Sequence, residues 1–227
     1  MHSKIELKSD QTIVFIGDSI TDADRDLPAY RPFGFGYVHF VANTLLAKYP
    51  ELNISIINAG ISGNTVRDLK HRWEKDCIRY KPDILSVLIG INDVARRYAE
   101  PEKLPRAVYE DEYELTYRQL LSQAEEQCNC QLILMEPFMF CDSPREMDQN
   151  IISRGKEKNQ MLKSLRRYVN IVECFAKEFE AVLVPLQSEI DKQIKQVPPE
   201  KWSEDSVHPY LWAHAWIAQR WLQATGL

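Results

Sequence analysis

The chain has 227 residues, of which 44% are hydrophobic and 27% are charged, a balance typical of a globular protein with a substantial core. Its formal net charge is −5, so it lacks the excess of basic residues with which proteins bind nucleic acid. No apolar run approaches the length of about 18 residues that spans a bilayer, so we expect neither a nucleic-acid nor a membrane partner.

The chain opens with the polar stretch MHSKIELKSDQ, which does not resemble a secretory signal peptide. The five cysteines have no spacing typical of a disulfide framework. Cys128 and Cys130 stand close together, but no second pair of Cys or His lies near them in the sequence. We therefore expect a cytoplasmic protein with reduced thiols that needs neither a metal nor an organic cofactor.

Five continuous apolar runs, rich in β-branched residues, predict strands that are buried on both faces of a sheet. In chain order they are Thr12–Gly17, Ile54–Asn58, Ile84–Gly90, Gln131–Glu136 and Ala181–Pro185. Stretches with helical periodicity alternate with these strands. We expect helices over Tyr37–Tyr49, Tyr109–Gln127, Lys156–Phe179, Gln187–Gln196 and Pro209–Thr225. A further helix is expected from Val66 to Cys77, where the apolar residues fall on one helical stripe.

Alternating strands and helices imply right-handed crossovers and a parallel sheet with helices on both faces. The sequence thus predicts an α/β fold, a three-layer α/β/α sandwich around a five-stranded parallel sheet. No repeat or linker divides the chain, so we expect one domain over residues 1–227. Two long, proline-containing connections, Ala95–Ala107 and Pro137–Gly155, are either binding loops or ordinary surface excursions.

Four short polar stretches lie where predicted strands end or just before the last helix. They are GDS ending at Ser19, NAGISGNT with Gly63, GIND with Asn92, and EDSVHPY with His208. Each is an ordinary turn signal when taken alone. Because parallel strands end at the same edge of a sheet, we expect these residues to meet there.

A serine hydroxyl becomes a nucleophile when a base accepts its proton, and histidine suits that task near neutral pH. We predict that Ser19 is the nucleophile and His208 the base. Pro209 disfavours helical geometry at His208 and suits the first position of a helix. Asp205, three residues before His208, is predicted to accept a hydrogen bond from Nδ1 and so to fix the imidazole.

Acyl transfer also needs hydrogen-bond donors that face the developing oxyanion. The backbone N–H groups of Ser19 and Gly63 and the side-chain amide of Asn92 are the predicted donors. A glycine at position 63 lets the backbone approach a ligand closely. Asp18 and Asp93 stand beside these residues, and we expect them to bond to the backbone of the turns instead.

The stretches FIGDSIT, GISGNT, IGIND and DSVHP resemble the four signature blocks of the SGNH (GDSL) hydrolase superfamily, in the same order. The residues that name the superfamily fall here on Ser19, Gly63, Asn92 and His208. The resemblance also implies Asp205 as the third member of the triad, above a flavodoxin-like sheet. The superfamily includes lipases, thioesterases, lysophospholipases and carbohydrate deacetylases, so it implies a reaction type and leaves the substrate open.

A narrower resemblance covers Gly36–Asp76 with the stretches KPDILSVLIGINDV and VYEDEYELTYRQLL, which are similar to intracellular acetyl-xylooligosaccharide esterases. It implies an acetylated xylo-oligosaccharide as substrate and a homo-oligomer. One departure lies beside the triad, because those esterases carry Trp directly before the catalytic Asp, where this chain has Glu204. Tyr30, Arg31 and Trp202 are the predicted substrate-binding residues, since aromatic faces and polar donors together suit sugars.

Other functions stay open at the level of sequence. A lipase, thioesterase or acyltransferase would keep the nucleophile, and a coenzyme A substrate would favour a basic cluster such as Arg96, Arg97 and Arg106. A long-chain lipase would also need a broad apolar surface. A non-catalytic flavodoxin-like binding module would leave the triad residues unaligned. A metal-dependent phosphodiesterase would need paired ligands, which the five histidines do not form.

Overall fold

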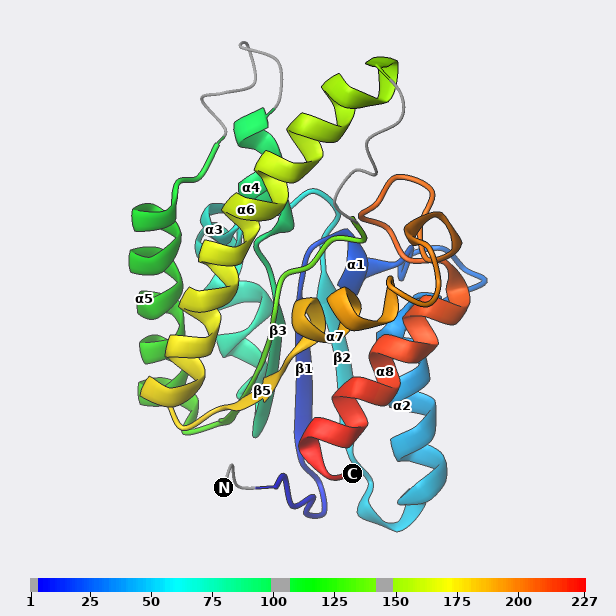
Figure 1. The fold of residues 1–227 in the computed structure, drawn as a ribbon. Coiled ribbons are helices and arrows are strands. Elements are labelled where there is room, and N and C mark those ends of the chain that lie inside the picture. Colours follow the sequence, from blue (N-terminus) through cyan, green and yellow to red (C-terminus); the bar gives the residue numbers. More distant parts are fainter. Residues whose placement is uncertain (1–3, 99–106, 142–148) are drawn as a thin grey trace.

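The computed structural model describes residues 4–98, 107–141 and 149–227 (Figure 1). Within them the centre of the molecule is a sheet of five parallel strands in the order β2-β1-β3-β4-β5. The strands are β1 (Thr12–Gly17), β2 (Ser55–Gly60), β3 (Ile84–Leu88), β4 (Gln131–Met135) and β5 (Val182–Val184). The prediction of a five-stranded parallel sheet is confirmed.

Helices cover both faces of this sheet. The longer ones are α2 (Tyr37–Lys48), α3 (Val66–Asp76), α5 (Glu110–Cys128), α6 (Gln149–Glu178), α7 (Leu186–Gln193) and α8 (Leu211–Thr225). Two short helices, α1 (Ser19–Asp22) and α4 (Ile91–Ala95), directly follow β1 and β3. In Figure 1, α3, α5 and α6 lie to one side of the sheet, whereas α2 and α8 lie together on the other. The three-layer α/β/α arrangement is therefore confirmed.

The order of the strands creates a switch point at β1, which has β2 on one side and β3 on the other. Gly17 at the end of β1 pairs with both Gly60 and Leu88, so three strand ends meet at one edge. In open α/β sheets, a ligand crevice lies outside the carboxyl ends of the strands at such a point. The segments that follow these three strands are those that carry Ser19, Gly63 and Asn92.

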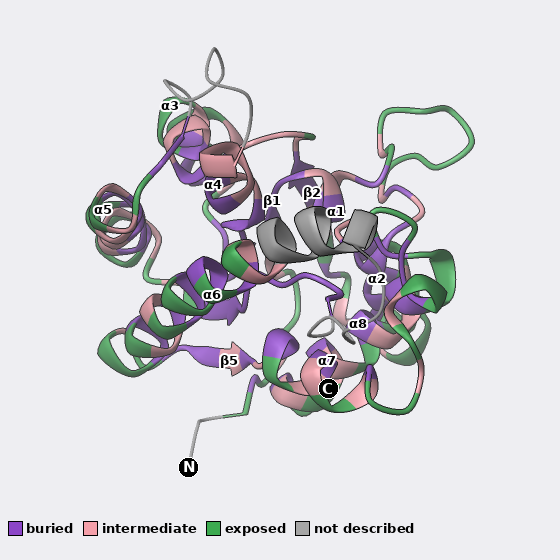
Figure 2. Ribbon diagram, turned by 45° about the horizontal axis from the view of Figure 1, so that its top comes forward, coloured by how far each residue is buried: buried purple, intermediate pink, exposed green. Residues whose placement is uncertain are grey.

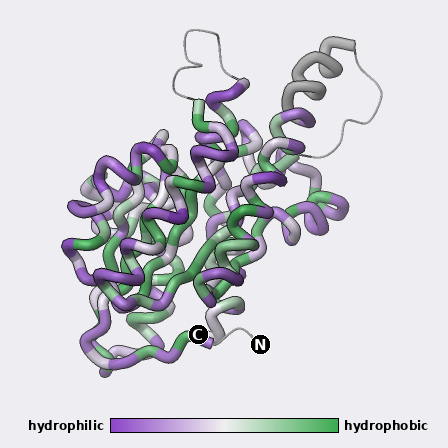
Figure 3. Tube along the Cα trace, turned by 90° about the vertical axis from the view of Figure 1, so that its left-hand side faces the viewer, coloured by the Kyte–Doolittle hydropathy of each residue, from purple (hydrophilic) through white to green (hydrophobic). Residues whose placement is uncertain are grey.

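The core fills the spaces between the sheet and its two helical layers. Figure 2 shows buried residues on the strands and on the inward faces of the helices, and Figure 3 shows hydrophobic residues gathered in the interior. Phe15 of β1 lies 5.4 Å from Trp221 of α8, measured between ring centroids. The Trp221 indole N–H also donates to the Ser86 hydroxyl of β3 at 3.0 Å. These contacts fix α8 against the middle of the sheet.

Some boundaries differ from the sequence-based expectation. β2 runs two residues further, because Ala59 and Gly60 still pair with β1. β3 ends earlier, at Leu88, and Gly90 has a φ of 135° that ends extended structure. β5 is shorter than predicted at both ends.

The two long connections are only partly described. The first begins with a short 3-10 helix, Arg96–Tyr98, and residues 99–106 lie outside the described part of the chain. For the second, residues 142–148 lie outside it, and α6 begins at Gln149, so the end of the predicted connection is helical. Among the described residues, no helix has both the length and the apolar character needed to cross a membrane.

Candidate active site

Ser19 stands where β1 turns into α1 and is the first residue of that helix. Asp18 caps the helix, because its Oδ1 accepts the Ile20 N–H at 3.0 Å. Before it, Gly17 leaves space for the neighbouring strand, since a Cβ at that position would collide with the Leu88 carbonyl oxygen. The tight junction therefore presents Ser19 at the carboxyl edge of the sheet.

The second half of the site is the turn between Ser203 and Pro209, whose ends form an isolated antiparallel bridge. Asp205 organises this turn. Its Oδ1 accepts the N–H groups of Val207 and His208, both at 2.8 Å, and the Ser203 hydroxyl at 3.0 Å. These three bonds fix the Asp205 carboxylate so that its other oxygen faces the His208 ring.

Ser19, His208 and Asp205 form a continuous chain of hydrogen bonds. Ser19 Oγ lies 2.9 Å from His208 Nε2, and His208 Nδ1 lies 2.5 Å from Asp205 Oδ2. Partial burial of Asp205 opposes its ionisation, but hydrogen bonds from the His208 side chain and backbone and from the Val207 N–H outweigh it and hold the pKa below its ordinary value. The carboxylate keeps a proton on Nδ1, which leaves the Nε2 lone pair for the hydroxyl.

Gly63 and Asn92 lie in two turns at the same edge of the sheet. Gly63 has a φ of +78°, within a tight turn in which the Asn64 N–H donates to the Ile61 carbonyl at 3.2 Å. The Ile61 N–H donates to the Gly17 carbonyl at 3.1 Å and so ties this turn to the end of β1. From α4, the Asn92 amide donates to the Asn64 carbonyl at 3.1 Å, and its second N–H meets no acceptor among the described residues.

Two carboxylic acids are buried beside these turns. Asp18 and Asp93 are 1% and 0% exposed. One oxygen of Asp18 accepts the Ile20 N–H and one oxygen of Asp93 accepts the Val66 N–H, both at 3.0 Å. Burial raises the pKa of each acid to about 7. Both acids thus bond to backbone, as the sequence predicted, at the starts of α1 and α3.

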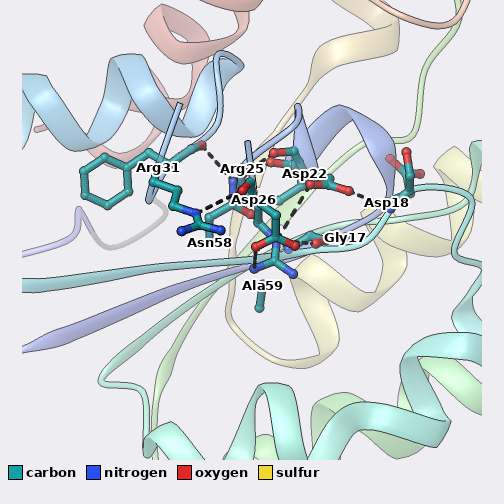
Figure 4. A network of polar contacts seen from close by, with 12 residues as sticks. Gly17, Asp18, Asp22, Arg25, Asp26, Arg31, Asn58 and Ala59 are labelled. Carbon is teal, nitrogen blue, oxygen red and sulfur yellow. Dashed lines mark hydrogen bonds and ion pairs between the residues drawn. The ribbon is translucent and has the colours of Figure 1, made fainter. Parts of the chain in front are cut away.

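A loop over residues 23–35 follows α1 and is fastened to β2 (Figure 4). The Asn58 amide donates to the Thr21 carbonyl at 2.7 Å and to the Phe33 carbonyl at 2.9 Å. Arg25 Nε donates to the Gly60 carbonyl at 2.7 Å. Both ends of the loop are thus held at the strand edge that carries the serine.

Two of the predicted substrate-binding residues, Tyr30 and Arg31, lie on this loop. Tyr30 is 42% exposed, and its ring packs edge-on against Phe35 with centroids 5.5 Å apart. Phe35 meets the ring of His214 on α8 at 5.7 Å. Arg31 is exposed, and its Nε donates to the Asp26 carbonyl at 2.9 Å. Both side chains are accessible at the surface, and their contact with substrate stays a prediction.

Trp202, the third predicted substrate-binding residue, lies in the interior. It is only 2% exposed, its ring stacks on Phe140 with centroids 5.5 Å apart, and its indole N–H donates to the Val197 carbonyl at 3.1 Å. Trp212 and Trp216 of α8 also contact it. A ring covered in this way has no free face for a sugar, so its burial argues against a substrate contact and indicates support of the turn that follows.

His214 is a residue near the site that the sequence analysis did not single out. It is 3% exposed, and burial, helped by the nearby charge of His208, lowers its pKa to about 4. The imidazole is therefore neutral at physiological pH. Its spacing from Ile217, Ala218 and Trp221 on the buried face of α8 is the signal that would have found it.

The basic cluster proposed for a coenzyme A substrate is engaged inside the protein. Arg96 donates to the Gly63 carbonyl at 2.5 Å, and Arg97 pairs with Glu110 at 2.7 Å. Arg106 lies outside the described residues. Because the two described arginines already have partners, they do not form a ready phosphate site.

Comparison with known proteins agrees with this geometry. Residues 15–216 match the GDSL-like lipase/acylhydrolase family. An acetylxylan esterase from Geobacillus stearothermophilus is 38% identical over 226 residues, which cover 98% of this chain and 97% of the esterase. Its crystal structure superimposes with a TM-score of 0.85. LAE5, an alpha/beta hydrolase from the metagenome of Lake Arreo in Spain, is 33% identical, with 97% of each chain covered and a TM-score of 0.83.

Solved variants of the Geobacillus esterase bear on individual positions. Those described as catalytic mutants replace a serine, an aspartate and a histidine by alanine, and the aspartate precedes the histidine by three positions, as Asp205 precedes His208. A further variant replaces a tryptophan directly before that aspartate, where this chain has Glu204. The matched family and the near full-length similarity lead to one conclusion: the chain belongs to the GDSL-like lipase/acylhydrolase family.

Proposed function

We propose that this protein is a serine carboxylic ester hydrolase that removes acetyl groups from xylo-oligosaccharides. The observation that carries the proposal is the aligned chain from Ser19 Oγ through His208 to Asp205. A non-catalytic binding module would have no reason to align these three groups. Membership in an acylhydrolase family and similarity to an acetylxylan esterase support the same reaction.

In the first half of the reaction, Ser19 Oγ attacks the carbonyl carbon of the acetyl group. His208 Nε2 accepts the hydroxyl proton, and the resulting imidazolium is stabilised by the Asp205 carboxylate at Nδ1. The electron pair of the carbonyl bond moves to oxygen and forms a tetrahedral oxyanion. When that intermediate collapses, His208 returns the proton to the departing sugar oxygen, which leaves as a hydroxyl group.

In the second half, water hydrolyses the acetyl-enzyme. His208 accepts a proton from the water, and the hydroxide attacks the acetyl carbon to give a second oxyanion. When this intermediate collapses, His208 returns the proton to Ser19 Oγ, and acetic acid leaves and loses its own proton to solvent as acetate. The proposed donors to both oxyanions are the Ser19 and Gly63 N–H groups and the free N–H of the Asn92 amide.

The proposed sugar substrate rests on the relatives and on the character of the surface near the triad. The side chains of His208 and Asp205 are about half exposed, so a large polar substrate can approach them. The neighbouring loop offers an exposed aromatic ring at Tyr30 and an exposed guanidinium at Arg31, a combination that suits a sugar. A cytoplasmic location and a homo-oligomeric state remain predictions from the sequence.

The decisive experiment compares the wild-type protein with Ser19→Ala on p-nitrophenyl acetate, p-nitrophenyl octanoate and acetylated xylo-oligosaccharides, with EDTA present. We expect acetate release by the wild type and a loss of about a thousandfold or more in the variant. Ser55→Ala is the matched control, because it makes the same change at the start of β2, away from the site. Activity that persists in Ser19→Ala would refute the mechanism, and faster turnover of the octanoate would refute the acetyl preference.

A further inference from the structure

The turn over residues 61–64 is held at almost every polar group of its backbone. The Ile61 and Ser62 N–H groups donate to the Gly17 carbonyl and to Asp22, at 3.1 and 3.0 Å. The Asn64 N–H donates to the Ile61 carbonyl, and the Asn64 carbonyl accepts the Asn92 amide. Within the part of the chain that the structure describes, the Gly63 N–H has no acceptor. The donor proposed for the oxyanion is thus the N–H that the turn leaves available.

Arg96 holds the glycine at the centre of this turn. One of its terminal nitrogens donates to the Gly63 carbonyl at 2.5 Å, and the other lies 3.5 Å from Asp68. Asp68 is itself fixed, because it forms the capping box of α3 with Thr65. Arg96 therefore connects the Gly63 peptide to a rigid helix start by a charge-assisted hydrogen bond, which is stronger than a neutral one.

Arg72 holds the same turn from its other side. Its Nε donates to the Asn64 side-chain oxygen at 2.6 Å, and its two terminal nitrogens donate to the carbonyls of Ala59 at 2.7 Å and Gly17 at 3.0 Å. The side chain is only 12% exposed and also pairs with Asp76. One guanidinium thus joins the end of β1, the end of β2 and the turn.

The hydrogen bonds from Arg96 and Arg72 matter because the residue at the centre of the turn is Gly63. A glycine has no Cβ to restrict it, and the Cβ that any other residue would carry at position 63 would have nothing within 4 Å to pack against. Packing therefore cannot set the direction of the Gly63 N–H, and hydrogen bonds must do so. Oxyanion donors act by being oriented before the charge develops.

We infer that Arg96 is a positioning residue for ester hydrolysis: it holds the Gly63 peptide so that its N–H faces the oxyanion, with Arg72 as the second anchor. This inference rests on the proposed function. Arg96 acts through the backbone and touches neither the triad nor the reacting atoms. It does not bind a phosphate group of an acyl donor, since its terminal nitrogens are engaged with Gly63 and Asp68.

The test compares Arg96→Met with Arg97→Met. Arg97 is the adjacent arginine, is buried to a similar degree, and pairs with Glu110 rather than with the turn. With p-nitrophenyl acetate, we expect kcat to fall about 10- to 100-fold in Arg96→Met, since small displacements of a catalytic group cost that much. We expect the inhibition constant for phenylboronic acid, whose serine adduct mimics the tetrahedral intermediate, to rise by a similar factor. Arg97→Met should stay within about twofold of the wild type in both.

Arg96→Lys serves as the partial rescue, because it keeps a charged donor with less reach, and its kcat should lie between those of the wild type and Arg96→Met. Thermal unfolding of each variant checks the fold. The inference is overturned if kcat and boronate affinity are unchanged in Arg96→Met, if Arg97→Met loses as much, or if the loss follows a lowered Tm. A wild-type protein that does not hydrolyse acetyl esters would instead refute the proposed function.

Discussion

Phe140 and Ser206 join two segments that are distant in the sequence: the Phe140 N–H donates to the Ser206 carbonyl at 2.8 Å. Ser206 has a φ of 74°, an unusual conformation for a residue with a side chain. It lies inside the turn that carries Asp205 and His208. The ring of Phe140 also stacks on Trp202, which directly precedes that turn. The segment after β4 therefore supports the turn of Asp205 and His208 through both backbone and side chain.

This support predicts the effect of Trp202→Ala. Loss of a fully buried indole should lower the free energy of unfolding by about 3–5 kcal/mol. The turn should lose its register at the same time, so activity should fall as well. Urea unfolding measures the first effect, with Leu211→Ala as the control because Leu211 is 57% exposed. A change of less than about 1 kcal/mol in Trp202→Ala would mean that the ring does not hold the turn.

Asp205→Asn tests the orientation of His208. The amide can no longer stabilise an imidazolium or hold the proton on Nδ1 in the same way, so we expect kcat to fall by about 10³- to 10⁴-fold. The Asp205 pKa is lowered in the folded protein, so the stabilisation it supplies is fully present above about pH 4 and is lost as the pH falls through the lowered value. Steady-state kinetics at pH 7 measure the loss, and a kcat in Asp205→Asn within about tenfold of the wild type would contradict this role.

Asp93→Asn tests the buried acid beneath the site. Its folded pKa is raised to about 7, so the folded protein binds a proton there more tightly than the unfolded chain does. That contribution to stability is present below about pH 4 and is lost as the pH rises through 7. We therefore expect the variant to be more stable than the wild type at pH 8, by a margin on the order of 1–3 kcal/mol, and by a clearly smaller margin at pH 5.

Urea unfolding at the two pH values measures this difference. Asp111→Asn is the matched control, because it changes an exposed aspartate on α5 in the same way. It should shift stability by less than about 0.5 kcal/mol at either pH. If Asp93→Asn were less stable than the wild type at pH 8 and pH 5 alike, the carboxylate would be needed in its charged form.

Gly63→Ala and Gly60→Ala separate backbone strain from collision. At position 63 a Cβ meets nothing within 4 Å, but φ is +78°, so we expect a cost of about 1–2 kcal/mol from conformation alone. At position 60 a Cβ would collide with the backbone of Asp22, so Gly60→Ala should destabilise the protein more. Thermal unfolding ranks the two variants, and the reverse order would contradict the structure.

Local signals predicted much of this molecule. Continuous apolar runs located the strands, and the Asp-x-x-His spacing placed Asp205 and His208 in one turn. Features that local signals do not reveal depend on distant partners. Arg96 looked like part of a phosphate cluster, because its partner Gly63 lies 33 residues away. Trp202 was predicted to bind substrate, and nothing in its spacing shows that Phe140 covers it. That contact stays a prediction, which its burial does not favour. The start of α6 was set too late, since Gly155 weakens the helical signal there.

The hydrogen bond between Ser19 and His208 spans 189 positions of the chain. During synthesis, the ribosome therefore completes the strand and turn that carry the hydroxyl long before it adds the imidazole. Until His208 has been added, the growing chain carries Ser19 without the imidazole that would accept its proton. The proposed hydrolysis therefore has to wait until nearly the whole chain has been made, because only then can His208 reach Ser19.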